Sequence, residues 1–227
     1  MDTKYLFYIT LIISIVVQII TGIIEIGAFF VKVPTAYLLI RQLLILELVV
    51  QFVEGIFYFW LAYNFHKLLD VTPKRYIDWA ITTPTMLITL MLYLIYLDKR
   101  DENKTNELEF FALFKEHSTV FISVMLLNWL MLLFGYLGEM NIIPVLSGVF
   151  IGFIPFFIYY YIIYQNYVWQ HKIGPFLFWY FVFFWGLYGL VAVLPYYVKN
   201  SFYNILDLFS KNFFGIFLSY IIFSGNY

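Results

Sequence analysis

Hydrophobic residues fill this chain in long runs that are separated by short polar or turn-forming breaks. A helix needs about 20 mostly apolar residues to cross the hydrocarbon core of a bilayer, and each run is long enough to do so. The pattern predicts seven membrane-spanning helices, at residues 5–31, 36–64, 75–98, 118–139, 142–166, 174–198 and 201–224. We therefore expect an all-α membrane protein in which residues 1–227 form a single seven-helix domain.

The connections between the runs indicate how the bundle is oriented. The long connection at 98–117, DKRDENKTNELEFFALFKEH, predicts a solvated loop ending in a short interfacial helix. The first apolar run is too long for a cleaved signal peptide, so we interpret it as the first span. Lysine and arginine are slightly more frequent on one side (Lys32, Lys99, Arg100, Lys104, Lys115 and Lys172) than on the other (Lys4, Lys67, Lys74 and Lys199). By the positive-inside rule, this places the N-terminus outside and the C-terminus in the cytoplasm.

Composition supports an integral membrane protein and excludes several other classes. The 227 residues are 63% hydrophobic and 12% charged, and their mean hydropathy is +0.86, which is far too apolar for a soluble domain of this length. The net charge of −1 predicts no nucleic-acid partner, and the absence of cysteine removes disulfides and cysteine-ligated metals. No segment is long enough for a separate soluble domain, so we do not expect an enzyme. His66, His117 and His171 fall at predicted helix ends, and we predict no metal site.

Charged residues inside two of the predicted helices require partners. In RYIDWAITTPTMLITL, Arg75, Asp78 and Thr82 recur at helical spacing, and Asp207 and Lys211 are one turn apart in the last helix. The two carboxylates, the arginine and the lysine could converge into a neutral cluster, which is how buried charges are tolerated. Such a cluster is either a structural ion-pair network or a functional site.

Aromatic residues at the same depth favour a functional site. Trp79 follows Asp78, and Trp185 and Tyr188 belong to the segment WGLY. These rings could sandwich a flat apolar ligand attached to the lysine, although aromatic residues in a membrane bundle usually belong to the core. A lysine amine in an apolar pocket is suited to forming a Schiff base with an aldehyde, which needs a carboxylate counterion once it is protonated.

These segments resemble the sequences of microbial rhodopsins. RYIDWAITTP (75–84), WGLY (185–188) and LDLFSKNFFG (206–215) are similar to that family's motifs in helices three, six and seven. The resemblance covers essentially the whole chain and implies all-trans retinal as the cofactor, bound to Lys211 as a protonated Schiff base. It also implies that Asp78 and Asp207 form the counterion and that Arg75 gates the outer side.

The same resemblance implies a retinal pocket, with Phe156 taken from the segment GFIPF (152–156). Its expected members are Trp79, Thr82, Thr83, Met86, Phe156, Trp185, Tyr188 and Ser210. Two positions depart from the family pattern. Gly189 replaces the proline that usually follows the helix-six tyrosine, and Ala192 replaces a pocket tryptophan, so we expect a looser pocket at the ring end of retinal.

The helix-three position that carries a proton donor in the family's outward proton pumps is Thr89. A hydroxyl group cannot replace a buried carboxylic acid as a rapid proton donor near neutral pH. This weakens a proton-pump interpretation, although water or another acid could donate the proton instead.

Helix two carries a polar stripe along an otherwise apolar helix. In LELVVQFVEGIFYFWL, Glu47, Gln51, Glu54 and Tyr58 follow each other at helical spacing. Intramembrane acids of this kind mark an ion path or proton relay; the alternative is that both are protonated and bonded to neighbouring helices. Aligning Tyr58 with the family's helix-two tyrosine brings Glu54 to the depth of the Schiff base, where channelrhodopsins have a gate glutamate.

A further set resembles the residues of the viral channelrhodopsins, the group 1 rhodopsins of giant viruses. The set comprises Ser14, Glu47, Glu54, Asp207 and Asn212. The resemblance implies a light-gated channel for small cations (H⁺, Na⁺, K⁺), because acidic side chains favour cations over anions. A light-driven outward proton pump is the first alternative and a photosensory rhodopsin the second. The expected partners are retinal and the lipid bilayer, and the sequence is compatible with a homo-oligomer.

Overall fold

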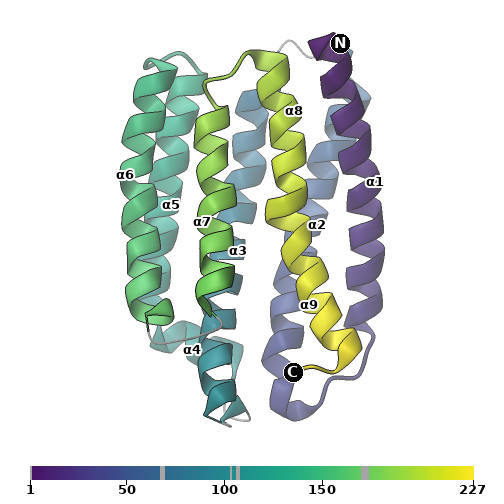
Figure 1. The fold of residues 1–227 in the computed structure, drawn as a ribbon, viewed down its shortest axis with the longest axis vertical. Coiled ribbons are helices and arrows are strands. Elements are labelled where there is room, and N and C mark those ends of the chain that lie inside the picture. The colour runs from purple at the N-terminus through teal and green to yellow at the C-terminus, as the bar shows by residue number, and fades with distance from the viewer. Residues whose placement is uncertain (1, 67–69, 103, 106–107, 170–173) are drawn as a thin grey trace.

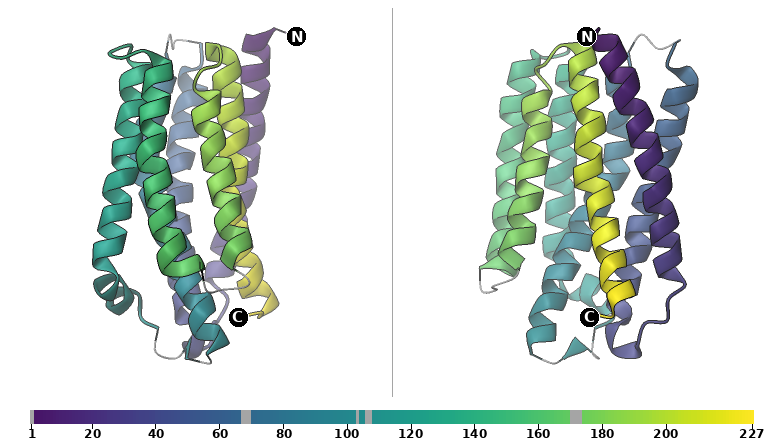
Figure 2. Two further views of the ribbon diagram at one scale, coloured as in Figure 1. Left: turned by 60° about the vertical axis from the view of Figure 1, so that its left-hand side comes forward. Right: turned by 45° about the vertical axis from the view of Figure 1, so that its right-hand side comes forward.

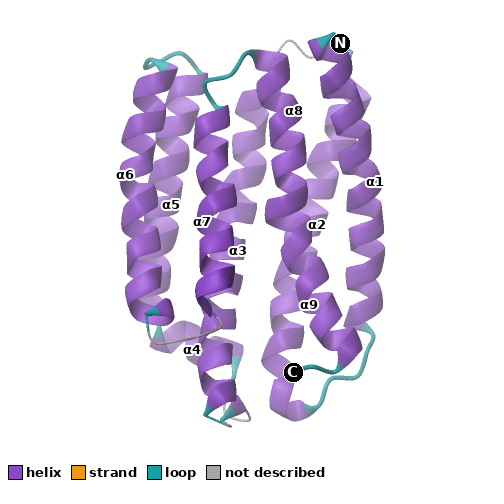
Figure 3. Ribbon diagram, viewed as in Figure 1, coloured by secondary structure: helices purple, strands orange, loops and turns teal. Residues whose placement is uncertain are grey.

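Long helices run side by side through the whole of the computed structural model (Figures 1 and 3). It describes residues 2–66, 70–102, 104–105, 108–169 and 174–227, and no strand occurs within them. Among these residues, seven spans are long and apolar enough to cross a membrane, which confirms the predicted number. They are α1 (Thr3–Phe29), α2 (Leu38–Asn64, after a 3-10 turn at Thr35–Tyr37), α3 (Thr72–Asp101), α5 (Ser118–Glu139), α6 (Val145–Ile163, continued by a π-helical turn at Tyr164–Val168), α7 (Gly174–Val191), and α8 (Tyr196–Asp207) joined to α9 (Phe213–Ser224).

The short helix α4 (Phe110–Glu116) lies in the long third connection, as predicted. It sits at the end of the bundle where the chain terminates, while the N-terminus lies at the opposite end (Figures 1 and 2). Which end faces the cytoplasm stays a prediction. Lys67 and Lys172, which contributed to it, and His171 lie outside the described residues.

The predicted boundary between the sixth and seventh spans is wrong. We expected helices at 174–198 and 201–224, whereas α7 ends at Val191 and α8 starts at Tyr196, directly after Pro195. Proline fixes φ and lacks an N–H group, so it is well placed at a helix start. The polar residues at 198–201 predict a loop, but Lys199 and Asn200 lie inside α8 and are buried.

Two other helix starts differ from the expected positions for the same reason. The third span begins at Thr72 rather than 75, beside Pro73, and includes Lys74 in its first turn. The span expected at 142–166 begins at Val145, after Pro144. The charges used to predict the orientation lie mostly inside helices, on one side Lys4, Lys74 and Lys199 and on the other Lys99, Arg100 and Lys115.

Helix α3 is the most enclosed of these spans. Of an 18-residue apolar stretch in each helix, 78% is buried in α3, against 17% in α5. Helices α5 and α6 pack closely where two glycines meet. Gly138 and Gly148 face each other, and a Cβ atom added at Gly148 would lie 2.7 Å from the backbone oxygen of Phe134. The two helices therefore approach to a distance that only glycine permits.

Replacing Gly148 by alanine is expected to destabilise the protein. Backbone atoms cannot move aside as a side-chain tip can, and overpacking of this kind costs about 1–3 kcal/mol. The thermal unfolding midpoint of Gly148→Ala should fall below that of the unmodified protein. Gly55→Ala is the matched control, because a Cβ at Gly55 would meet no atom within 4 Å. Equal midpoints for the two variants would contradict the prediction.

Candidate functional site

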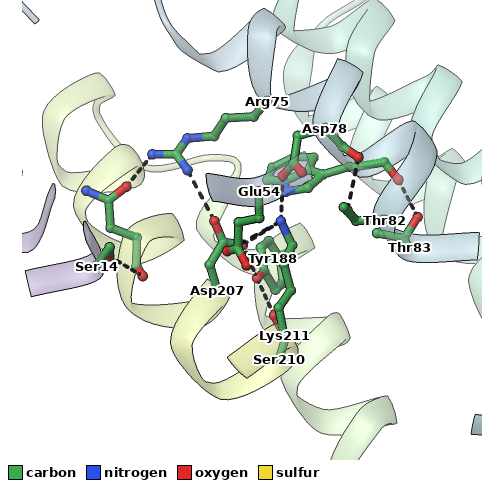
Figure 4. Close-up of polar contacts among 12 residues, drawn as sticks. Ser14, Glu54, Arg75, Asp78, Thr82, Thr83, Tyr188, Asp207, Ser210 and Lys211 are labelled. Atoms are coloured by element: carbon green, nitrogen blue, oxygen red, sulfur yellow. Dashed lines mark hydrogen bonds and ion pairs between the residues drawn. The ribbon is translucent and has the colours of Figure 1, made fainter. Parts of the chain in front are cut away.

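Lys211 lies at the centre of a buried charged cluster, in the π-helical turn Leu208–Asn212 that joins α8 to α9. Its Nζ atom is 2.5 Å from Asp78 Oδ2, 3.6 Å from Glu54 Oε1 and 3.7 Å from Asp207 Oδ1 (Figure 4). The structure thus brings Lys211, Asp78 and Asp207 together as their spacing predicts. It adds Glu54, which sequence reasoning had placed only at a similar depth. π-Helical turns are rare and frequent at functional sites.

Asp207 connects this lysine to a buried arginine. Arg75 Nη1 is 3.4 Å from Asp207 Oδ2, and the hydroxyl groups of Tyr58 and Tyr188 donate to the same carboxylate at 2.7 and 2.6 Å. The guanidinium group also lies over the ring of Tyr203, 5.7 Å from its centroid. Both oxygens of Asp207 are therefore bonded.

Two asparagines complete the surroundings of Arg75, and sequence reasoning missed both. Arg75 Nε donates to Asn200 Oδ1 at 2.9 Å, and Arg75 Nη2 donates to Asn204 Oδ1. Asn200, Asn204, Asp207 and Lys211 follow each other at intervals of four, three and four, so their helical spacing was available as a signal. This spacing is not apparent when a loop is expected at Asn200.

The cluster contains three carboxyl groups but only two cationic side chains. Neither oxygen of Glu54 has a hydrogen-bond partner among the described residues, and the side chain is fully buried. A neutral cluster requires one of the three carboxyl groups to carry a proton, because unpaired buried charges are strongly unfavourable. Glu54 is the member with the weakest contacts, which are Lys211 Nζ at 3.6 Å and the side chain of Gln18 beside it.

An aromatic cavity opens beside Lys211 between α3, α5, α6 and α7. The volume of the cavity is about 720 Å³, which includes space that is open to the outside of the protein. Six of the residues expected around retinal line it, together with Lys211: Trp79, Thr83, Phe156, Trp185, Tyr188 and Ser210. Thr82 and Met86 are not among the residues that line it. The Thr82 hydroxyl donates to the backbone oxygen of Asp78 at 3.0 Å, and Met86 is buried in the same apolar cluster as Phe156 and Trp185.

Much of the cavity wall comes from residues that sequence reasoning did not identify. They are Tyr76, Met131, Leu132, Gly135, Gly148, Val149, Gly152, Phe153 and Tyr203, while Gly189 and Ala192, which the sequence places at the ring end of the pocket, also line the cavity. Phe153 occupies the space beside Gly189, since its ring would lie 2.7 Å from a Cβ at that position.

The polar stripe predicted on α2 is buried against α1 and the seventh span. Gln51 Nε2 donates to the side-chain oxygen of Gln18 at 2.5 Å, and Asn212 Nδ2 donates to Gln51 Oε1 at 3.1 Å. Closer to Arg75, Ser14 Oγ donates to the backbone oxygen of Asn204 at 3.0 Å. These bonds connect three of the predicted polar positions, Ser14, Gln51 and Asn212, to the neighbouring helices.

Lys199 forms a second buried ion pair, which the loop assignment had concealed. Its Nζ is 2.6 and 2.8 Å from the two carboxylate oxygens of Glu139, at the end of α5. Glu139→Gln should lower stability by about 1.5–3 kcal/mol, because the ammonium group loses charge-assisted hydrogen bonds. Thermal unfolding beside the exposed-site control Glu116→Gln measures this. A midpoint as high as that of the control would show that the pair contributes nothing.

Comparison with known proteins agrees with these observations. A family profile described as bacteriorhodopsin-like protein matches residues 9–225. No curated protein matches the chain in sequence.

Solved structures of microbial rhodopsins share the fold. Viral rhodopsin OLPVRII is 28% identical, with 99% of each chain covered and a TM-score of 0.79. Blue light-absorbing proteorhodopsin from Med12 is 19% identical, with 98% of each chain covered and a TM-score of 0.73. Bromide-bound halorhodopsin from Halobacterium salinarum is 15% identical, with 99% of this chain and 96% of that chain covered and a TM-score of 0.70. The last two similarities show the fold alone. Because the family profile spans nearly the whole chain, this protein belongs to the bacteriorhodopsin-like family of microbial rhodopsins.

Proposed function

We propose that this protein is a light-gated cation channel with all-trans retinal held on Lys211. The observation that supports the proposal best is the polar stripe of buried side chains on α2. It runs from Glu47 through Gln51 to Glu54, whose carboxyl group lies next to Lys211. Buried acids in a membrane helix usually serve an ion or proton path. The proposal includes the orientation predicted above, with the N-terminus outside.

The residues around Lys211 fit retinal, the chromophore that the family implies. The lysine lines the aromatic cavity, and Trp79 and Tyr188 line it beside the charged cluster. Retinal bound there would supply absorption of visible light and a light-driven change of shape. Asp78 and Asp207 would balance the positive charge at Nζ, while the rings of Trp79, Trp185 and Tyr188 would confine the polyene.

Asn212 connects Lys211 directly to the polar stripe on α2. It is the next residue along the chain, and its side-chain amide bonds to Gln51, which in turn bonds to Gln18. A displacement of Lys211 therefore acts on a set of hydrogen bonds that hold α1, α2 and α9 together. Loosening them would let water and a cation pass, and acidic side chains favour H⁺, Na⁺ or K⁺ over anions.

Photocurrents recorded from whole cells under voltage clamp test the proposal. We expect currents whose reversal potential follows the sodium or potassium gradient. Currents that keep one direction at every voltage would reject the channel in favour of a pump.

Glu54→Gln should change the size or the ion selectivity of the photocurrent while the pigment still forms. The substitution keeps the shape of the side chain but removes the carboxyl group beside Lys211. Glu109→Gln, at an exposed position, is the matched control. Currents equal to those of the control would remove Glu54 from the conduction path.

A light-driven outward proton pump is the second candidate. Thr89 donates its hydroxyl to the backbone oxygen of Thr85 at 3.1 Å, and it also lies beside the carboxyl group of Glu47. Glu47 thus places an acid next to the position where family pumps have their proton donor. The voltage dependence of the current separates this candidate from the channel.

A further inference from the structure

A second group of buried carboxyl groups lies between α1, α2 and α9, apart from the cluster at Lys211. Glu25 of α1 and Glu47 of α2 are 1% and 2% exposed, and they are close enough to interact electrostatically. Glu47 precedes Glu54 by seven residues, which is about 10 Å along a helix. Neither Glu25 nor Glu47 forms an ion pair with a residue that the structure describes.

Thr21 and Ser219 carry hydroxyl groups one helical turn away from the contact between Glu25 and Gly215. The Glu25 carboxyl group rests against Gly215, where an added Cβ would overlap it, and Gly27 lies against the ring of Phe223. Ser219 is halfway between these two α9 contacts and on the same helix face. Thr21 precedes Glu25 by one turn on α1, so its side chain lies on the same face as the carboxyl group.

The packing of α1 against α2 brings Glu47 to the same place. A Cβ added at Gly22 would be 3.8 Å from the Gln51 side chain. Because α1 and α2 are consecutive spans that run in opposite directions, moving one turn from Gln51 to Glu47 corresponds to moving from Gly22 toward Glu25. The two carboxyl groups therefore lie at the same depth on α1 and α2, within electrostatic reach of each other, and the hydroxyl group of Thr89 on α3 also lies beside Glu47.

The four residues around this contact, Thr21, Glu25, Glu47 and Ser219, each have a side-chain oxygen without a hydrogen-bond partner among the described residues. Thr21 Oγ1, Glu25 Oε2, Glu47 Oε1 and Ser219 Oγ are buried and make no hydrogen bond within the described part of the chain. Buried polar atoms of this kind need a partner, since leaving them unpaired is costly. Carboxylate and hydroxyl oxygens are the hard ligands that suit cations such as those of the alkali metals.

We infer that Glu25 and Glu47 form a binding site for one Na⁺ or K⁺ ion, with the hydroxyl groups of Thr21 and Ser219 among its ligands. One monovalent cation and one proton together balance the two carboxyl groups. The inference rests in part on the proposed function, because Glu47 belongs to its ion path. It gives α1 a role in cation binding through Glu25, and it places the cation site about two helical turns from Glu54 along α2.

Infrared difference spectroscopy on the unilluminated pigment in lipid nanodiscs tests the site without recording any current. Na⁺ or K⁺ is exchanged for N-methyl-D-glucamine, which is too large to enter. We expect reversible changes in the carboxyl bands, smaller in Glu25→Gln and in Glu47→Gln and absent from the double variant. The Na⁺ concentration at half-saturation should rise at least about tenfold in each single variant, because a charged ligand is lost.

Glu116→Gln, the same chemical change at an exposed position, controls for cations that gather at the surface. Each variant must keep its visible absorption band, which shows that it has folded. Unchanged bands in the double variant, or no cation-dependent bands in the unmodified protein, would overturn the inference. Cation-dependent bands without photocurrents would leave the site standing and reject the channel, whereas photocurrents without such bands would reject the site alone.

Discussion

Lys211→Ala is expected to yield a colourless protein that forms no pigment when retinal is added. Lys211 lines the aromatic cavity, and its Nζ is 2.5 Å from a carboxylate that can balance a positive charge there. Alanine has no amine to join to an aldehyde. Visible absorption after addition of retinal measures the effect, and we expect a complete loss of the band.

Lys104→Ala is the control for this substitution, because Lys104 is exposed and pairs only on the surface with Glu102 among the described residues. It should form pigment normally. Circular dichroism should show that Lys211→Ala keeps its helix content, so that a missing band reports lost attachment rather than an unfolded chain. A visible band in Lys211→Ala would refute the attachment site.

The number of spans could be predicted from hydropathy alone, because a bilayer imposes a minimum length on each apolar run. The span at 118–139 has the predicted limits. The error at 198–201 arose because polar residues were equated with a loop. Lys199 and Asn200 are polar yet buried, since each finds a partner inside the bundle. A helix that faces a polar interior can contain residues that look like a break.

The charged centre of the site could be predicted because ionised residues within membrane helices are rare and need partners. A second stripe was present in the sequence but not recognised. Thr10, Ser14, Gln18, Thr21 and Glu25 recur every three or four residues on α1, and all are buried. Only Ser14 was identified, through the family resemblance. Threonine and glutamine are weak signals individually, and their spacing carries the information.

The α5 and α6 wall of the cavity could not be predicted by the same reasoning. Apart from Asn128 on α5, whose amide donates to Thr83 at 2.7 Å, these helices are apolar on nearly every side, so hydrophobic periodicity does not separate the face toward the cavity from the face toward lipid. Gly135, Gly148 and Gly152 contribute to the cavity through the space they leave. Identifying such positions requires the packing of the two helices, which a single sequence does not contain.

Asp207→Asn is expected to cause the largest loss of stability among the substitutions considered. Asp207 is fully buried, pairs with Arg75 and Lys211, and accepts hydrogen bonds from Tyr58 and Tyr188 on its two oxygens. Asparagine has one acceptor oxygen and no charge, so one tyrosine hydroxyl loses its acceptor and Arg75 loses its carboxylate. Breaking a buried pair in this way costs about 3–5 kcal/mol. For a chain of this size, that corresponds to a fall in the unfolding midpoint on the order of 10 °C.

Glu102→Gln is the control that separates the effect of burial from the effect of losing the ion pairs. Glu102 also pairs with two cations, Lys99 at 3.2 Å and Lys104 at 3.1 Å, but all three side chains are exposed. Solvent screens such pairs, and they contribute at most about 1 kcal/mol. The two variants should therefore differ several-fold in their loss of stability, measured as thermal loss of the visible band at one heating rate. Similar losses would mean that Asp207 does not hold the cluster together, and that Arg75 is stabilised by Asn200, Asn204 and the surrounding rings instead.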